Sequence, residues 1–96
     1  MWILSATSGD QAVTFRLMPG STKTIGRAQG ADLIVDAPLV SRVHCRLEAG
    51  PTAVEVVDLS STNGTFVNDE RIDRASLTTG DRLRVGRVEL TVERAH

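Results

Sequence analysis

The sequence of 96 residues is poor in cysteine, lysine and aromatic side chains. Cys45 is the only cysteine, so no internal disulfide can form and nothing indicates an oxidising compartment. No apolar run approaches the roughly 20 residues of a membrane-spanning helix. The start, Met1 to Leu4, lacks the basic flank and long apolar stretch of a secretory signal. We therefore expect a cytoplasmic protein, or an intracellular part of a larger one, with no membrane partner.

The chain also lacks a dominant charge. Its formal net charge is -1, from 11 basic and 12 acidic residues, so no overall positive field would attract nucleic acid. Lys23 is the only lysine, and the other basic residues are all arginine. The excess of arginine over lysine has two interpretations. It is either a codon bias without function, or a use of guanidinium groups for bidentate recognition of phosphate.

Short apolar runs, broken by turn residues, make up most of the chain. Apolar and polar residues alternate over residues 13–17, 82–85 and 88–93, which is typical of strands with one buried face. Turn residues such as Ser8-Gly9-Asp10 interrupt the runs and leave strands of about four to seven residues. Because the length allows one modest core, the sequence predicts a single all-β domain over residues 1–96.

Two segments are harder to assign. Residues 36–49 begin with Asp-x-Pro and carry apolar residues at 39, 40, 43 and 47, a spacing that also fits a capped amphipathic helix. The two valines in that pattern oppose a helix only slightly, because helix propensity is a weak prior. The pattern alone leaves helix and strand equally open. The tail, residues 93–96, is expected to fray.

Three polar clusters stand at expected strand ends or in loops, where a rigid sheet positions binding residues. They are Gly26-Arg27, Ser41-Arg42-Val43-His44 and Ser60-Ser61-Thr62-Asn63-Gly64-Thr65. Together they offer two guanidinium groups, several hydroxyls and one side-chain amide, without a carboxylate. Such donors suit a dianionic phosphoester. The set cannot easily hold a metal, so we expect neither a metal nor a cofactor.

The order and spacing of these clusters resemble those of the forkhead-associated (FHA) domain, a module that reads phosphothreonine. The matching elements, from about Val13 to about Val92, are Gly26-Arg27, Ser41-x-x-His44, Thr62-Asn63-Gly64-Thr65, Val67-Asn68 and Gly80-Asp81. Each motif is weak alone, whereas the ordered set is specific. The resemblance implies an eleven-stranded β-sandwich with its site in loops at one end. It also implies a loop over residues 36–43 and a strand over residues 44–48.

The resemblance further implies a role for each matching residue. Five would form the phosphopeptide-binding site: Arg27, Ser41, Arg42, Thr62 and Asn63. The first three would contact the phosphate, the threonine would lie beside the phosphothreonine, and the asparagine would hold the ligand backbone. Three more would shape the loops: Gly26, His44 and Gly64. The implied partner is a protein or peptide phosphorylated on threonine, such as a kinase substrate.

Two positions depart from the family pattern. Many members carry asparagine where this chain has Arg42. The turn after the expected seventh strand is Asn68-Asp69 in place of the usual Asn-Gly. Because aspartate accepts a positive φ less readily than glycine, we expect a slightly strained turn or one of another type.

The residues leave two other functions open. Ser41, His44 and Asp58 supply the nucleophile, base and carboxylate of a hydrolase, provided that they hydrogen-bond to one another. A phosphate-independent scaffold would keep the fold and use another surface, but it would have no need of Arg27, Ser41 and Asn63. We expect a module without catalytic residues, in which His44 braces a loop.

Overall fold

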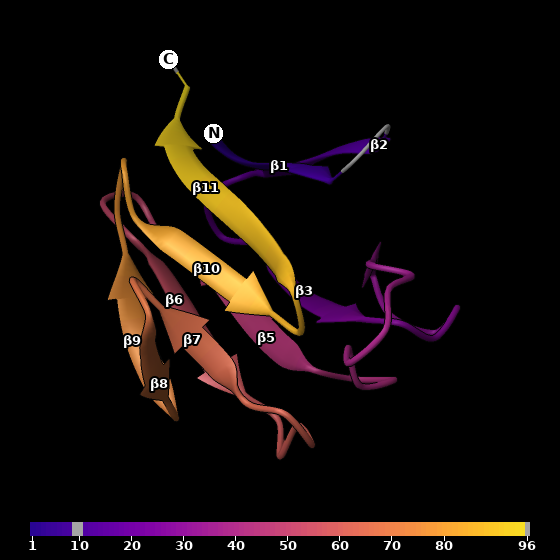
Figure 1. The fold of residues 1–96 in the computed structure, drawn as a ribbon. Coiled ribbons are helices and arrows are strands. Elements are labelled where there is room, and N and C mark those ends of the chain that lie inside the picture. Colours follow the sequence, from indigo (N-terminus) through magenta and orange to yellow (C-terminus); the bar gives the residue numbers. More distant parts are fainter. Residues whose placement is uncertain (9–10, 96) are drawn as a thin grey trace.

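The computed structural model describes residues 1–8 and 11–95, which form eleven strands (Figure 1). The strands are β1 (Trp2–Ser8), β2 (Gln11–Leu17), β3 (Thr22–Gly26), β4 (Leu33–Ile34), β5 (Cys45–Ala49), β6 (Val54–Asp58), β7 (Thr65–Val67), β8 (Glu70–Ile72), β9 (Arg74–Leu77), β10 (Arg82–Val85) and β11 (Val88–Arg94). Among the described residues there is no helix that could cross a membrane. The turn predicted at Gly9-Asp10 lies outside the described residues, as does His96.

The strands form two sheets that share one core. The six-stranded sheet has the order β2-β1-β11-β10-β7-β8, and the five-stranded sheet has the order β4-β3-β5-β6-β9. Neighbouring strands are antiparallel except for the parallel pair β3 and β4. The prediction of an eleven-stranded, all-β sandwich is confirmed.

The core lies between the sheets and is built by the predicted alternation. In β10, Leu83 and Val85 are buried while Arg82 and Arg84 face outward. The buried cluster combines such residues of the six-stranded sheet with Ile25 and other residues of the five-stranded sheet. Full burial of an aliphatic side chain contributes about 1.5–3 kcal/mol, so this two-sided packing holds the sheets together.

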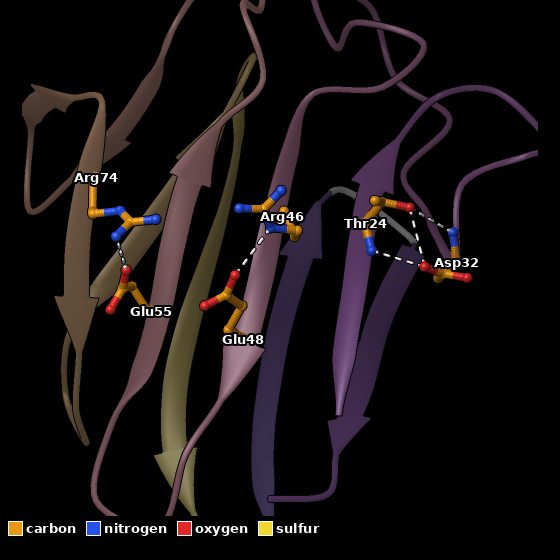
Figure 2. A network of polar contacts seen from close by, with 6 residues as sticks. All are labelled: Thr24, Asp32, Arg46, Glu48, Glu55 and Arg74. Carbon is orange, nitrogen blue, oxygen red and sulfur yellow. Dashed lines mark hydrogen bonds and ion pairs between the residues drawn. The ribbon is translucent and has the colours of Figure 1, made fainter. Parts of the chain in front are cut away.

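Ion pairs occupy the outer face of the five-stranded sheet (Figure 2). Glu48 and Glu55 stand directly opposite each other on β5 and β6, an arrangement of like charges that is unfavourable by itself. Arg46 lies 3.1 Å from Glu48, and Arg74 lies 3.0 Å from Glu55. Each glutamate is therefore neutralised by an arginine of its own sheet.

A second contact in Figure 2 closes the loop after β3, residues 27–32. The backbone N–H of Thr24 donates to Asp32 Oδ2 at 2.9 Å, and the Thr24 hydroxyl donates to the same oxygen at 3.2 Å. These hydrogen bonds hold the pKa of the Asp32 carboxyl below its ordinary value. They tie the far end of this loop, at Asp32, to β3.

Residues 36–49 form a loop followed by a strand, as the resemblance implied. The helix that their apolar spacing allowed is wrong, because β5 occupies Cys45–Ala49 and Leu39 has a φ of 71°. The apolar spacing arises differently: Val40 reaches the core from the loop, and Leu47 reaches it from β5. The strand starts one residue later than expected.

Two further predictions concern the turn after β7 and the C-terminal tail. The turn between β7 and β8 has positive φ at both Asn68 (49°) and Asp69 (70°), the pattern of a type I′ turn. Asp69 therefore adopts a positive φ, which glycine usually supplies at this position, and this agrees with the prediction of a slightly strained turn. The expectation of a frayed tail is wrong for its described part, since β11 extends to Arg94 and pairs with Trp2.

Candidate functional site

Three connections converge on an open pocket of about 690 Å³. Its lining residues are Arg27, Asp36, Ala37, Pro38, Leu39, Val40, Ser41, Arg42, Thr62 and Asn63. They lie in the β3–β4, β4–β5 and β6–β7 loops. The first two loops connect strands of the five-stranded sheet, and the third crosses from that sheet to the six-stranded sheet. All five residues that the resemblance assigns to phosphopeptide binding line this pocket.

Arg27 follows β3 directly and is exposed. Its backbone N–H donates to the Ser41 carbonyl at 2.9 Å, and its Nε–H donates to the Val40 carbonyl at 3.1 Å. A guanidinium carries five N–H groups, so the Nε bond fixes its direction and leaves the four N–H groups of the terminal nitrogens for a ligand. This geometry suits bidentate binding of an oxyanion.

Ser41 and Thr62 join two of the loops. The backbone N–H of Thr62 donates to Ser41 Oγ at 3.0 Å. A hydroxyl that accepts one hydrogen bond still has its own O–H to donate. Ser41 is therefore held in place by the β6–β7 loop while its proton can point to a ligand in the pocket.

Asn63 and Leu39 make a second link between the same loops. Asn63 Nδ2 donates to the Leu39 carbonyl at 3.1 Å. Leu39 is 46% exposed and has a φ of 71°, a conformation that costs a non-glycine residue on the order of 1 kcal/mol or more. The Asn63 amide thus stabilises a strained backbone at the pocket, and the side-chain oxygen Oδ1 stays available as an acceptor.

His44 lies beneath these loops with none of its surface exposed. The backbone N–H of Ser41 donates to His44 Nδ1 at 3.1 Å, and Nε2 lies 2.8 Å from the Gly64 carbonyl. Because Nδ1 accepts a hydrogen bond, Nε2 must carry the proton and donate to Gly64. The ring therefore links the loop of Ser41 to the loop of Asn63.

Gly26 and Gly64 shape the loops for different reasons. A Cβ atom at Gly26 would overlap the carbonyl oxygen of Arg42 and approach its carbonyl carbon to 2.7 Å. Gly64 has a φ of 89°, which side chains rarely adopt. Glycine is therefore needed at position 26 because the Arg42 backbone lies so close, and at position 64 because the backbone has a positive φ.

We expect Gly26→Ala to weaken phosphopeptide binding at least tenfold, because the new Cβ must push the Arg42 backbone, and with it Ser41, away from Arg27. Gly30→Ala is the matched control in the same loop, since a Cβ there would meet nothing within 4 Å. Isothermal titration with one phosphothreonine peptide compares the two variants. Equal affinities for both would show that the loop adapts without cost.

The Asp58 carboxylate organises the β6–β7 loop. Asp58 Oδ1 accepts from the hydroxyls of Ser61 at 2.5 Å and Thr65 at 2.7 Å, and Oδ2 accepts from the Ser61 N–H at 3.2 Å. Burial raises the pKa of the Asp58 carboxyl, but these hydrogen bonds lower it by more, so the pKa lies below its ordinary value. The sequence suggested Asp58 only as a catalytic carboxylate. Its role in the loop was missed, although hydroxyl residues three and seven positions later, Ser61 and Thr65, carried a signal for it.

Ser41, His44 and Asp58 do not form a catalytic triad. The ring nitrogens of His44 contact the backbone N–H of Ser41 and the Gly64 carbonyl, whereas Ser41 Oγ accepts from Thr62. No hydrogen bond between Asp58 and His44 occurs among the described residues, where Asp58 binds Ser61 and Thr65. The serine hydroxyl thus lacks the adjacent base that nucleophilic catalysis requires.

A comparison with protein families matches the FHA domain over residues 23–86, about two thirds of the chain. The chain belongs to the FHA domain family. FHA domains are protein-interaction modules that bind phosphothreonine peptides. The matched range includes all three loops that line the pocket.

Relatives of this FHA domain occur in mycobacteria. The glycogen accumulation regulator GarA of Mycolicibacterium smegmatis is 38% identical over 90 residues, which cover 92% of this chain and 56% of GarA. The ABC transporter ATP-binding/permease protein Rv1747 of Mycobacterium tuberculosis is 41% identical over 78 residues, which cover 81% of this chain and 9% of that protein. The chain thus spans little more than half of one relative and less than a tenth of the other.

Solved structures agree with this assignment. The FHA domain of FhaA, in a crystal structure with the intracellular domain of Rv3910, superposes with a TM-score of 0.86 at 33% sequence identity. The match covers 96% of this chain and 99% of that one. The two chains therefore share the same β-sandwich fold over nearly their whole length.

Proposed function

We propose that residues 1–96 form one FHA domain, and that it binds a phosphothreonine peptide of a phosphorylated partner in the pocket of Arg27, Ser41 and Asn63. The observation that carries this proposal is that these three side chains, from three loops, line one open pocket. Hydrogen bonds between the loops hold the three side chains in place before a ligand arrives. Such preorganisation reduces the entropic cost of binding.

The phosphate chemistry follows from the donors. A phosphothreonine phosphate presents three strong acceptor oxygens and nearly two negative charges at neutral pH. The terminal nitrogens of Arg27 bind two oxygens, and the Ser41 hydroxyl donates to the third. Arg42, exposed on the pocket wall, adds a second positive charge. Charge-assisted hydrogen bonds of this kind are roughly twice as strong as neutral ones.

The rest of the pocket suits the peptide around the phosphate. Asn63 Oδ1 accepts from a backbone N–H of the ligand, and Thr62 lies beside the phosphothreonine. The apolar lining residues Ala37, Pro38 and Val40 provide a surface for the threonine methyl group. The similarity to the FhaA domain, which forms a complex with an intracellular protein domain, supports a protein as the partner.

We further infer that the domain is not an enzyme and that it acts in the cytoplasm. The hydrogen bonds of Ser41 and His44 support the first inference. Cys45 supports the second, because a free buried thiol is typical of reducing compartments. Burial and the nearby charge of Asp58 raise the pKa of this thiol to about 12, so it stays protonated and unreactive.

The test is a set of titrations with one peptide sequence that carries threonine, phosphothreonine or phosphoserine. We expect no binding without phosphate, and at least about tenfold tighter binding of phosphothreonine than of phosphoserine. Burying one methyl group contributes roughly 0.8 kcal/mol, and an unfilled pocket adds a cavity cost; tenfold corresponds to ~1.4 kcal/mol. Equal affinity for the phosphorylated and unphosphorylated peptides would instead favour the scaffold function.

Affinity is expected to fall as the pH drops through about 6, where the phosphate takes up a proton and loses one charge. The dianion is the better ligand for Arg27 and Arg42, so binding is fullest above that pH. Asp58 does not contribute there, because its hydrogen bonds to Ser61 and Thr65 hold the pKa of its carboxyl below the ordinary value. A peptide with a sulfate ester, which does not titrate, is the control. An equal pH dependence for both peptides would place the titrating group in the protein.

A further inference from the structure

The arginines of this domain fall into two groups. Arg46, Arg74 and Arg82 make the ion pairs that occur among residues 1–8 and 11–95. Arg71, on β8, is exposed and takes part in none of them. Its positive charge is therefore left without a carboxylate in the described part of the chain.

The Arg71 side chain is directed toward the β6–β7 loop. A Cβ atom placed on Gly64 would lie 2.9 Å from Arg71 Nε, 3.2 Å from its Cζ and 3.4 Å from its Cδ. The guanidinium therefore lies against the backbone of Gly64, the residue after Asn63. Glycine at this position leaves the space that Arg71 occupies, in addition to allowing a positive φ.

A second cation lies on the same outer face of the six-stranded sheet. Phe66 on β7 pairs with Arg71 on one side and with Arg84 on the other. The Arg84 guanidinium lies 4.3 Å from the centroid of the Phe66 ring, and its buried Nε has no hydrogen-bond partner. Glu89 on β11 stands opposite Arg84 in the register but forms no ion pair with it. Arg71 and Arg84 thus flank Phe66 as two arginines that make no ion pair among the described residues.

We propose that Arg71 forms an anionic subsite that binds an aspartate or glutamate side chain of the phosphorylated partner. This proposal rests on the proposed function, because it places the same peptide in the neighbouring pocket. Asn63 lines that pocket, and Gly64 follows it at the usual ~3.8 Å between Cα atoms. At about 3.3 Å per extended residue, the acidic residue lies within roughly three positions of the phosphothreonine.

The chemistry of the subsite favours a carboxylate. A guanidinium presents two parallel N–H groups that match the two oxygens of a carboxylate. One side of the Arg71 guanidinium is shielded from water by the Gly64 backbone, which strengthens an interaction that would otherwise be weak at a surface. Because the chain as a whole has a net charge of -1, this preference is local to the site.

The experiment uses a neutral phosphothreonine peptide in which a single glutamate, or a glutamine in its place, is moved across the three positions on either side of the phosphothreonine. Each peptide is titrated against wild type, Arg71→Gln and Arg74→Gln. Arg74 is the matched control, since it is an exposed arginine that pairs with Glu55 on the other sheet. Thermal melts verify that each variant is folded.

For wild type we expect glutamate to bind about three- to tenfold tighter than glutamine at one or two of these positions. The advantage shrinks at high salt, as for any partly exposed ion pair. Arg71→Gln brings the glutamate-to-glutamine ratio to about one, and Arg74→Gln leaves the ratio at the wild-type value.

Equal affinities of wild type for the glutamate and glutamine peptides at every position would overturn the subsite. A ratio that survives in Arg71→Gln would overturn it as well. In either case, binding that still depends on the phosphate would leave the proposed function intact. If no peptide binds better with phosphate than without, the proposed function fails, and the subsite fails with it.

Discussion

Replacing Arg27 by alanine is expected to weaken phosphothreonine-peptide binding by a hundredfold or more while the fold stays intact. Two charge-assisted hydrogen bonds from one guanidinium contribute roughly 1.5–3 kcal/mol each, and ~1.4 kcal/mol corresponds to a factor of ten. The fold should survive, because the Arg27 side chain is exposed and makes a single hydrogen bond to a loop carbonyl.

Calorimetric titration of wild type and Arg27→Ala with one peptide measures this loss. Arg74→Ala is the control, since it removes another exposed arginine, one that does not line the pocket. Arg27→Lys keeps the charge but loses the fork of donors, so we expect an affinity between those of wild type and the alanine variant. If Arg27→Ala bound like wild type, the phosphate anchor would have to be Arg42.

Replacing His44 by alanine is expected to lower both the stability and the affinity of the domain. His44 is fully buried, and its two ring nitrogens satisfy the Ser41 N–H and the Gly64 carbonyl. Each buried group left without a partner costs about 1–3 kcal/mol, and the vacated ring leaves a cavity. We therefore expect a loss of roughly 2–5 kcal/mol in the free energy of unfolding. The affinity falls because the loops of Ser41 and Asn63 lose their brace.

Urea denaturation gives the stability of the His44→Ala variant, and titration with a phosphothreonine peptide gives its affinity. Val43→Ala is the matched control, because Val43 is the neighbouring residue and is 46% exposed. An unchanged denaturation midpoint together with abolished binding would contradict the bracing role. His44 would then belong among the groups that contact the ligand.

The strands were predictable because their signal is local. Alternation with period two specifies which face of a strand is buried, and residues 82–85 and 88–93 follow it in both sequence and structure. Residues 36–49 show the limit of this approach. Val40 and Leu47 are both buried, but one lies in a loop and the other in a strand, so their spacing resembled a helix without forming one.

The candidate site was predictable only in part. Arg27, Ser41 and Asn63 carry recognisable side chains at a recognisable spacing, and they line one pocket as expected. Leu39 and Asp58 were missed in their actual roles. Leu39 contributes a backbone carbonyl in an unusual conformation, and Asp58 acts through hydroxyls on the following loop.

By itself, the sequence determined the all-β class, the turns and the chemical character of the loops, because each of these depends on residues close together in the chain. Only the tertiary structure decided which loops meet and where their side chains point. Asn63 reaches Leu39 from 24 residues away, and Thr62 reaches Ser41 from 21 residues away. Such contacts depend on how two sheets pack and cross over, which brings distant residues within a few ångströms, and no local pattern encodes that distance.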